Sequence, residues 1–292
     1  MAGGMAGGMA GSDPDTLRAE MLERWEHAAG GWGKHAKRMR EFGMPVSSWM
    51  IDQARLQPGQ RVLELAAGPG DTGFLAAELI RPGGMLVCTD AAETMLEVAR
   101  SRAAELGIDN VEFKRVELEW IDLETASIDA VLCKWGLMFA VDPEAALRET
   151  LRVLRPGGRI ALAAWDEPSL NDWATIPTRA MVDLGHMAAP DPNAPGMFIL
   201  SAPGRLQELL ESAGFVDVVV DSVPTPRAFA DVETYVAETR EISSFFGAAF
   251  DPLPAAQREE VVRKIAELSH PSTAADGSVR FTGRSLVAAA DA

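Results

Sequence analysis

The stretch Arg61-Val-Leu-Glu-Leu-Ala-Ala-Gly-Pro-Gly-Asp-Thr-Gly73 decides the fold of this chain. A short apolar run, suited to a strand buried on both faces, passes into a glycine-rich turn and then into a helix that begins at Asp71. Gly68 and Gly70 allow the backbone to turn tightly beside a ligand. This succession of strand, turn and helix is typical of the mouth of a nucleotide-type cofactor site.

The glycine pattern alone leaves the cofactor open. Gly68, Gly70 and Gly73 satisfy the pattern G-x-G-x-x-G, and Asp90 follows Gly70 by 20 residues, as in a dinucleotide-binding site. A dinucleotide would place its pyrophosphate at the N-terminus of the helix, where free N–H groups favour an anion. Here, however, the turn is acidic and Glu64 precedes it. Acidic residues would repel a pyrophosphate but suit a ligand with an ammonium and a sulfonium group, such as S-adenosylmethionine (SAM).

The turn resembles the first motif of the class I SAM-dependent methyltransferases, in which an acidic residue precedes small residues and glycines. Ala66 stands where the family usually has its first glycine. Further matches follow in the family's order at Leu86–Asp90, Ala91–Leu96, Ile128–Trp135 and Arg152–Arg159. The resemblance covers roughly residues 50–165 and is much more specific than one glycine loop. Within the family, the chain is most similar to the small-molecule methyltransferases of the quinone-biosynthesis kind.

The resemblance implies an α/β fold. We expect a Rossmann-like, doubly wound sheet of seven strands with an antiparallel last strand, together with N-terminal helices and a helical insertion that covers the site. The expected strands are 61–66, 85–89, 111–118, 128–135, 158–165, 216–223 and 279–287. The expected helices are one from about 16 to a break at 30–33, a short second one, and others near 46–54, 71–80, 92–106, 143–154, 204–213, 231–245 and 254–268. Pro156-Gly157-Gly158 is expected to end a helix and lead into the fifth strand.

The chain is expected to form one methyltransferase domain over residues 16–292. Residues 1–15 are predicted to be a disordered tail, because they are rich in glycine and lack apolar periodicity. The predicted parts of the domain are the N-terminal helices (16–54), the SAM-binding core (55–165), an acceptor-site segment (166–203), the helical cover insertion (224–277) and the last strand (278–292).

The resemblance also implies which residues contact the cofactor. Asp90, at the end of the second strand, would accept hydrogen bonds from both ribose hydroxyls, and Met95 would lie over the adenine. Glu117 and Leu118 stand where the family usually has Asp-Ala beside the adenine, although Glu119 could take this role instead. The predicted cofactor contacts are Glu64, Ala66, Gly68, Gly70, Asp90, Ala91, Met95, Glu117, Leu118 and Lys134.

The acceptor pocket is expected to be apolar. Trp135 and Met138 follow the fourth strand at the same edge of the sheet, and Trp32 lies in the N-terminal segment that folds over the cofactor in similar enzymes. His35 is a candidate general base, although a solvated helix residue explains it equally well. A strict catalytic residue is not required, because alignment and desolvation supply most of the rate of methyl transfer. The chain has 13 methionines, and methionine is an adaptable lining for an apolar cavity. An aromatic or isoprenoid small molecule is therefore the expected acceptor.

Composition excludes several classes of partner. The net charge of −16 argues against nucleic acid, whose binding relies on neutralising phosphates. No apolar run approaches a membrane span, and we expect a cytoplasmic protein without membrane insertion. The acidic segment after the fifth strand, from Asp166 to Asp172, is expected to be solvated or to orient substrate, and no metal site is predicted. In the strand order that the resemblance implies, two strand spacings separate Cys88 and Cys133, so they are expected to be buried free thiols.

Two rival functions remain open from the sequence. An NAD(P)-dependent oxidoreductase would need a proton-donating Tyr or His near the hydride site, and the only tyrosine is Tyr235 in the predicted insertion. A noncatalytic SAM-binding protein would bind the cofactor with the acceptor cavity filled or open to water. The acceptor, the atom that is methylated and the oligomeric state, monomer or homodimer, are not determined.

Overall fold

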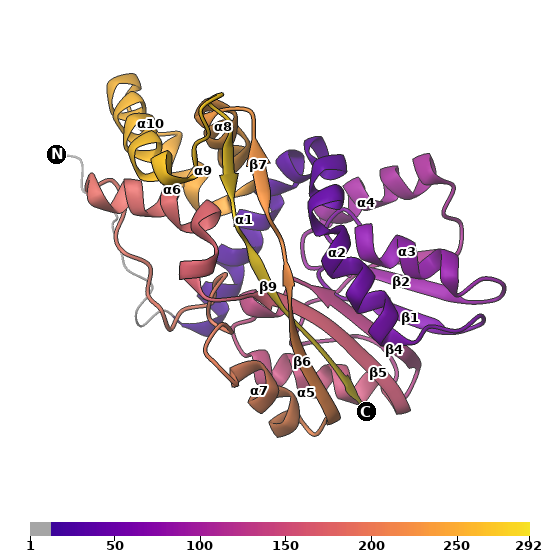
Figure 1. The fold of residues 1–292 in the computed structure, drawn as a ribbon. Helices are drawn as coiled ribbons and strands as arrows, with labels where there is room; N and C mark the ends of the chain where they lie inside the picture. Colours follow the sequence, from indigo (N-terminus) through magenta and orange to yellow (C-terminus); the bar gives the residue numbers. More distant parts are fainter. Residues whose placement is uncertain (1–12) are drawn as a thin grey trace.

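The computed structural model describes residues 13–292 and confirms the predicted seven-stranded sheet, in the order β3-β2-β1-β4-β5-β9-β6. Its strands are β1 (Arg61–Glu64), β2 (Met85–Asp90), β3 (Val111–Arg115), β4 (Ile128–Lys134), β5 (Leu154–Trp165), β6 (Val216–Pro224) and β9 (Arg284–Asp291). Strands β1 to β5 pair in parallel, whereas β9 lies antiparallel between β5 and β6 (Figure 1). The predicted antiparallel last strand is therefore present.

Helices cover both faces of the sheet (Figure 1). One face carries α2 (Ala36–Ala54), α3 (Asp71–Leu79) and α4 (Glu93–Leu106), and the other carries α5 (Pro143–Val153) and α7 (Arg205–Ala213). Successive strand residues alternate between the two cores, so Val62 packs beneath the first set of helices and Leu63 beneath the second. Both are fully buried, as a strand in a doubly wound sheet requires.

A helical cover lies beyond one end of the strands and appears at the upper left of Figure 1. It consists of α1 (Pro14–Lys34), α6 (Asp172–Asp183), α8 (Val232–Ile242), α9 (Ser244–Phe250), α10 (Ala255–Ser269) and the small antiparallel sheet of β7 (Arg227–Phe229) and β8 (Val279–Phe281). Tyr235 of α8 is buried and donates a hydrogen bond to the carbonyl oxygen of Trp173 in α6, at 2.6 Å. Glu26 joins α1 to α4, because its carboxylate accepts hydrogen bonds from Glu93 N and Thr94 N.

The predicted break at residues 30–33 is wrong. Helix α1 continues through these glycines to Lys34, and α2 follows as one helix where two were expected. Gly31 permits close packing: a Cβ there would lie 1.8 Å from the carbonyl oxygen of Glu241 in α8. The glycine therefore marks a contact between helices and does not mark a loop.

Several predicted boundaries also change. The last strand, expected at 279–287, is two strands, because β8 belongs to the small sheet and β9 begins only at Arg284. Between them Gly283 passes so close to Thr225 that a Cβ would lie 2.1 Å from its carbonyl oxygen. Strand β5 already includes 156–158, and β3 ends at Arg115, three residues before the predicted end. Asp13 caps α1, and Pro14 and Asp15 belong to it. Residues 1–12 of the predicted tail lie outside the described residues.

Gly31→Ala is expected to lower the free energy of unfolding by about 1–3 kcal/mol, the usual cost of overpacking. Gly30 is the matched control, because it lies in the same helix and a Cβ there meets nothing within 4 Å. Gly30→Ala is expected to stabilise the protein by roughly 0.5–1 kcal/mol through helix propensity. Urea unfolding of both variants measures the difference, and equal effects of the two substitutions would contradict the proposed contact between α1 and α8.

Candidate active site

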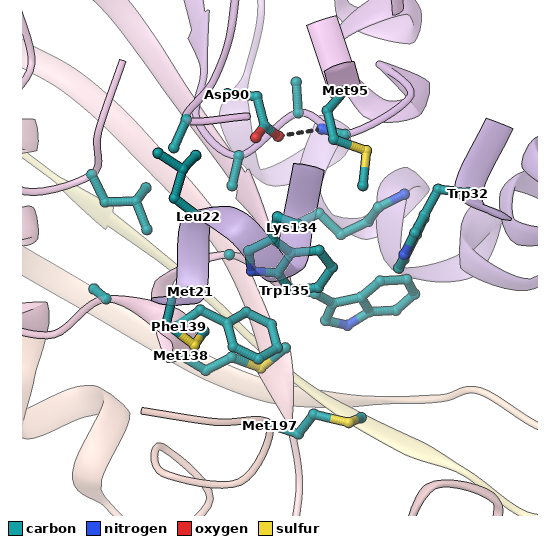
Figure 2. Close-up of a pocket in the computed structure, with 18 of the residues that line it drawn as sticks. Met21, Leu22, Trp32, Asp90, Met95, Lys134, Trp135, Met138, Phe139 and Met197 are labelled. Carbon is teal, nitrogen blue, oxygen red and sulfur yellow. Dashed lines mark hydrogen bonds between the residues drawn. The ribbon is translucent and has the colours of Figure 1, made fainter. Parts of the chain in front are cut away.

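A cavity of about 520 Å³ opens at the carboxyl edge of the parallel strands, beneath the helical cover. Its volume is in the range of small-molecule sites. The loops after β1 to β4 and the end of β5 form one wall, while α2 and the cover, including α1, form the other. Figure 2 shows Asp90 and Met95 at one end of this cavity, Trp135 near its centre and Met197 toward the other end.

The glycine-rich loop after β1 is tightly wound. Gly68 and Gly70 have φ of 51° and 83°, in the left-handed region that favours glycine. Ala66 has φ 49°, which explains why similar enzymes have glycine there, and an alanine at this position bears some strain. A Cβ on Gly136 would come within 2.4 Å of the Ala66 Cβ, so the loops after β1 and β4 are in close contact. Of the cofactor contacts predicted in this loop, Ala66 and Gly68 line the cavity, whereas Gly70 does not.

Glu64 supports this loop from below. Only 3% exposed, it is absent from the cavity lining, so the prediction that it contacts the cofactor directly is not supported by the geometry. Its Oε1 accepts a hydrogen bond from Gly73 N at 2.8 Å, which fixes the first turn of α3. Burial raises the pKa of Glu64 to about 8, against the opposing effects of the Gly73 N–H and Lys134. Sequence reasoning predicted Glu64 as a cofactor contact, whereas the structure places it beneath the loop that lines the cavity.

Buried charges continue from Glu64 along the floor of the cavity. Asp71 pairs with Arg102 at 2.7 Å, and Asp71 itself lines the cavity. Lys134, at the end of β4, also lines the cavity, and its Nζ donates to Ser47 Oγ at 3.2 Å. Burial lowers the pKa of Lys134, while Asp71 and Glu64 raise it. This floor therefore carries acids close to the position that the sequence assigned to a cationic ligand.

Asp90 has the geometry expected of a ribose ligand. Its Oδ2 accepts a hydrogen bond from Gly68 N at 2.9 Å and its Oδ1 from Ala92 N at 3.0 Å. Because a carboxylate oxygen has two lone pairs, each still has acceptor capacity toward the cavity, which Asp90 and Ala91 line. Burial raises the pKa of Asp90, opposed by the backbone N–H groups. Two hydroxyls on neighbouring carbons would satisfy both oxygens.

The region predicted to hold the adenine is also assembled. Met95 lines the cavity near Asp90 (Figure 2), and Glu117 and Leu118 line it from the loop after β3. Glu119 lines it as well, but its carboxylate is engaged: it accepts a hydrogen bond from Asp142 N at 2.8 Å and pairs with Arg18 at 3.4 Å. The geometry therefore favours Glu117 over Glu119 as the residue that contacts the cofactor.

An aromatic wall forms the rest of the cavity. Trp135 after β4 stacks on Trp165 at the end of β5, with ring centroids 4.4 Å apart. Phe42 of α2 stacks on Trp165 at 6.0 Å, and Trp173 of α6 meets Trp165 edge-on at 5.0 Å. The predicted pocket residues Trp32, Trp135 and Met138 line the cavity, but sequence analysis missed three others, Phe42, Trp165 and Trp173. The position of Trp165 at the end of a parallel strand could have indicated its role.

His35 is not placed as a general base. It ends α1 and its Nε2 lies 2.6 Å from Glu241 Oε2 on α8, outside the cavity lining. Among the described residues that line the cavity there is no histidine. His35 is instead part of the contact that holds α1 to α8, together with the ion pair between Lys34 and Glu241 at 2.6 Å. The structure therefore places His35 in the contact between α1 and α8, away from the cavity.

The acidic segment after β5 is solvated only in part, because Glu167 and Asp172 are exposed but Asp166 is not. Asp166 is buried and forms an ion pair with Arg284, while Asn171 donates hydrogen bonds to the carbonyl oxygens of Asp166 and Arg284. These contacts fix β5 to the beginning of β9. Within residues 13–292, no group of three or more His, Cys, Asp or Glu side chains is arranged to hold a metal ion.

The two cysteines are free and buried, as predicted. Burial raises the pKa of both thiols, that of Cys133 to about 12.

No helix in the described part of the chain is long and apolar enough to cross a membrane.

Arg227 is a site residue that sequence analysis missed. It belongs to β7 and lines the cavity, although its side chain is only 3% exposed. Its guanidinium lies 4.5 Å from the ring centroid of Phe42 and 4.6 Å from that of Trp173. Burial lowers the pKa of Arg227 to about 10, so the side chain remains charged at neutral pH.

These residues together fit SAM. The left-handed loop gives the backbone a close approach to a ligand, and Asp90 offers free acceptor capacity to a ribose. Asp71 and Asp90 line the cavity, where their carboxylates would stabilise an ammonium and a sulfonium. The sheet order and the antiparallel last strand are those of the Rossmann-like class I SAM-dependent methyltransferases.

Comparison with known proteins agrees. Residues 56–214 match a family model described as a methyltransferase domain. The chain is 34% identical over 187 residues to the nocamycin O-methyltransferase of Saccharothrix syringae, covering 61% of this chain and 67% of that protein. It is 36% identical over 120 residues to the ubiquinone/menaquinone biosynthesis C-methyltransferase UbiE of Pseudomonas fluorescens, covering 41% of this chain and 47% of that protein. The chain thus matches about half the length of UbiE.

The fold is also known from solved structures. The match to the crystal structure of the YcgJ protein of Bacillus subtilis covers 84% of this chain and 97% of the YcgJ chain, with a TM-score of 0.59 and 19% sequence identity. At this identity the likeness shows the fold alone. The family match, which spans more than half of the chain, shows more: this chain belongs to the methyltransferase-domain family and is a class I SAM-dependent methyltransferase. The rival oxidoreductase function is not supported, and Tyr235 is buried in the cover with its hydroxyl bonded to Trp173.

Proposed function

We propose that this methyltransferase transfers a methyl group to an apolar or aromatic small molecule that lies against the wall of Trp135, Trp165 and Trp173. The observation that carries the proposal is the position of this wall. It continues from β4 to β5, directly beside the loops after β1 and β2 that fit the cofactor. A flat, apolar acceptor would be desolvated there and held next to the methyl donor.

The relatives support this acceptor class. One of them is named for O-methylation of nocamycin and the other for C-methylation in ubiquinone and menaquinone biosynthesis. Both names refer to the methylation of small organic molecules or to their biosynthesis. The cavity of this chain is suited to the same broad class, because its lining is rich in aromatic and methionine side chains.

The proposed reaction is a direct in-line displacement. When bound, SAM supplies a methyl group on a positively charged sulfur; the acceptor's electron pair forms the new bond to this carbon, and the pair of the broken S–CH₃ bond stays on sulfur. Asp90 and the loop at Gly68 would hold the donor. Trp135 and Trp165 would orient the acceptor, and the cover of α1 and α8 would exclude water. Alignment and desolvation of this kind contribute several kcal/mol to lowering a barrier.

An acceptor screen tests the proposal. The protein is incubated with methyl-labelled SAM and matched acceptors, namely phenols, hydroxyquinones, amino acids and phosphoethanolamine, and labelled products are counted. We expect label only in the aromatic and quinone compounds. Trp165→Phe is expected to raise the acceptor KM up to about tenfold with little change in SAM affinity, since aromatic contacts contribute roughly 0.5–1.5 kcal/mol. Trp120→Phe is the control, because Trp120 is 79% exposed.

Two results would contradict the proposal. One is labelling of the polar compounds in preference to the aromatic ones. The other is an equal effect of the substitutions at Trp165 and Trp120 on the acceptor KM, which would mean that the aromatic wall does not contact the acceptor.

A further inference from the structure

We propose that the acceptor carries an acidic oxygen on a conjugated ring, binds as its anion, and is recognised by Arg227. This inference rests on the proposed function, because it names the chemistry of the acceptor in the same cavity. Three observations support it: the position of Arg227, its unused hydrogen-bond donors with their charge, and the aromatic path between Arg227 and the cofactor loops.

Arg227 is buried at the wall of the cavity that faces the ends of the strands. It comes from β7 of the cover, which packs against α8. The guanidinium carbon of Arg227 lies 4.5, 4.6 and 5.3 Å from the ring centroids of Phe42, Trp173 and Phe229. Arginine is rarely buried unless it is paired. A buried guanidinium in a ligand cavity therefore requires a partner of opposite charge. The protein provides one carboxylate, but Arg227 shares it with a second arginine.

Glu238 is the partner that the protein provides. Arg227 Nη2 donates to Glu238 Oε1 at 2.6 Å, but Glu238 also forms an ion pair with Arg38. One carboxylate is thus shared by two guanidinium groups, and the cluster carries a net charge of +1. Arg38 is 43% exposed and is screened by water, whereas Arg227 is not.

The donors of Arg227 are also incompletely used. A guanidinium has five N–H donors. Within residues 13–292, the only hydrogen bonds assigned to Arg227 come from Nη2, to Glu238 and weakly to Met39 Sδ at 4.0 Å. Nε and Nη1 have no assigned partner among these residues. An anionic oxygen in the cavity would accept from this group and balance its charge.

An aromatic path joins this cation to the cofactor side of the cavity. Trp135 follows β4 and stacks on Trp165, which contacts both Phe42 and Trp173. Those two rings are the ones that flank Arg227. A flat conjugated anion can lie along this wall with its charged oxygen at Arg227 and its reactive atom toward Trp135.

This arrangement also explains how the reaction proceeds without a histidine in the described cavity lining. The acidic O–H of the acceptor gives its proton to water before or during binding, and Arg227 stabilises the resulting anion. The electron pair of this anion, delocalised over oxygen and the conjugated carbons, forms the bond to the methyl carbon. The S–CH₃ bond breaks with its pair on sulfur, so the products are the neutral methylated acceptor and S-adenosylhomocysteine.

Binding of two matched probes tests the proposal. Tryptophan fluorescence of the full chain, saturated with S-adenosylhomocysteine at pH 7.5, is titrated with 2-hydroxy-1,4-naphthoquinone, an anion at this pH, and with neutral 1,4-naphthoquinone. We expect the wild type to prefer the anion. Arg227→Met is expected to weaken anion binding by at least about tenfold, the range for a hydrogen bond to a charged group, and to leave neutral binding within about twofold. Arg227→Lys should retain part of the preference.

The controls separate recognition from folding. Arg280→Met removes an exposed arginine from β8, the strand paired with β7, and should bind both probes as the wild type does. Arg227→Met leaves Glu238 with one partner, so the double variant Arg227→Met/Glu238→Gln removes the buried pair together. Unchanged affinity for S-adenosylhomocysteine shows that each variant is folded.

The outcomes distinguish the two proposals. A preference for the anion that persists in Arg227→Met and in the double variant overturns the role of Arg227. Equal binding of both probes to the wild type also overturns it, but leaves the aromatic acceptor of the proposed function standing. Failure of the wild type to bind either probe, while it binds S-adenosylhomocysteine, contradicts both proposals.

Discussion

Asp90→Ala is expected to weaken binding of SAM and S-adenosylhomocysteine by roughly 100-fold, or about 3 kcal/mol. Without the carboxylate, the complex loses two charge-assisted hydrogen bonds to the ribose hydroxyls, each contributing about 1.5–3 kcal/mol. The variant also loses the hydrogen bonds that Asp90 accepts from Gly68 N and Ala92 N, and these bonds position the glycine-rich loop. Isothermal titration with both sulfur ligands measures the loss.

Two further variants locate the cause. Asp90→Asn keeps one carbonyl oxygen that can accept from Gly68 N, so its loss should be smaller. Asp109→Ala removes an acid that is 81% exposed and should leave both affinities unchanged. If Asp90→Ala binds S-adenosylhomocysteine within about threefold of the wild type, the carboxylate does not hold the ribose.

Glu64→Gln is expected to stabilise the ligand-free protein increasingly as the pH rises from about 5 to 8. Burial is the chief reason that the pKa of Glu64 in the folded protein is raised from its ordinary value of 4.5 to about 8. The stability contributed by this group is therefore fully present below pH 4.5 and is lost as the pH rises through 8. The loss approaches roughly 1.4 kcal/mol per pH unit for one proton. Glutamine avoids this loss and can still accept from Gly73 N.

Urea unfolding at several pH values measures the effect. The advantage of Glu64→Gln over the wild type should grow with pH by several kcal/mol in total and level off above pH 8. Glu112→Gln, a substitution of an exposed acid on β3, should show no such dependence. A pH-independent difference, or a variant less stable than the wild type at pH 9, would mean that Glu64 is already ionised in the folded state.

The central sheet was predictable because its signals are local. Short apolar runs placed β1, β2 and β4 within two residues of their observed bounds. The motif at Asp90 placed a carboxylate at the edge of the sheet where the loop at Gly68 meets it. Parallel strands bring their carboxyl ends together, so motifs far apart in sequence could be assigned to one site.

Contacts between distant segments were not predictable in the same way. The glycines at 30–33 indicated a break, but Gly31 serves the approach of α8, which lies some 200 residues later. Glu64 was recognised as an acid of the first motif, but its burial beneath Gly73 depends on how α3 packs on the sheet. A sequence motif predicts that an acidic residue belongs to the site. Whether its side chain lines the cavity or supports the loop from beneath depends on tertiary packing.

The acceptor side was the least predictable part. Arg227, Trp173 and Phe42 come from three separate elements of the chain and meet only in the folded cavity. No motif links them, and Arg227 lies in the segment expected only to cover the site. The cofactor side depends on backbone turns with recognisable sequences, while the acceptor side depends on side chains brought together by the cover.

A crystal structure of the protein with S-adenosylhomocysteine and 2-hydroxy-1,4-naphthoquinone tests the central claim most directly. We predict that the ribose hydroxyls lie within hydrogen-bond distance of Asp90, and that the sulfur faces the naphthoquinone ring on the wall of Trp135 and Trp165. The adenine should lie between Met95 and Leu118. An adenine stacked on Trp165, or a ribose away from Asp90, would contradict the assignment of the two halves of the cavity.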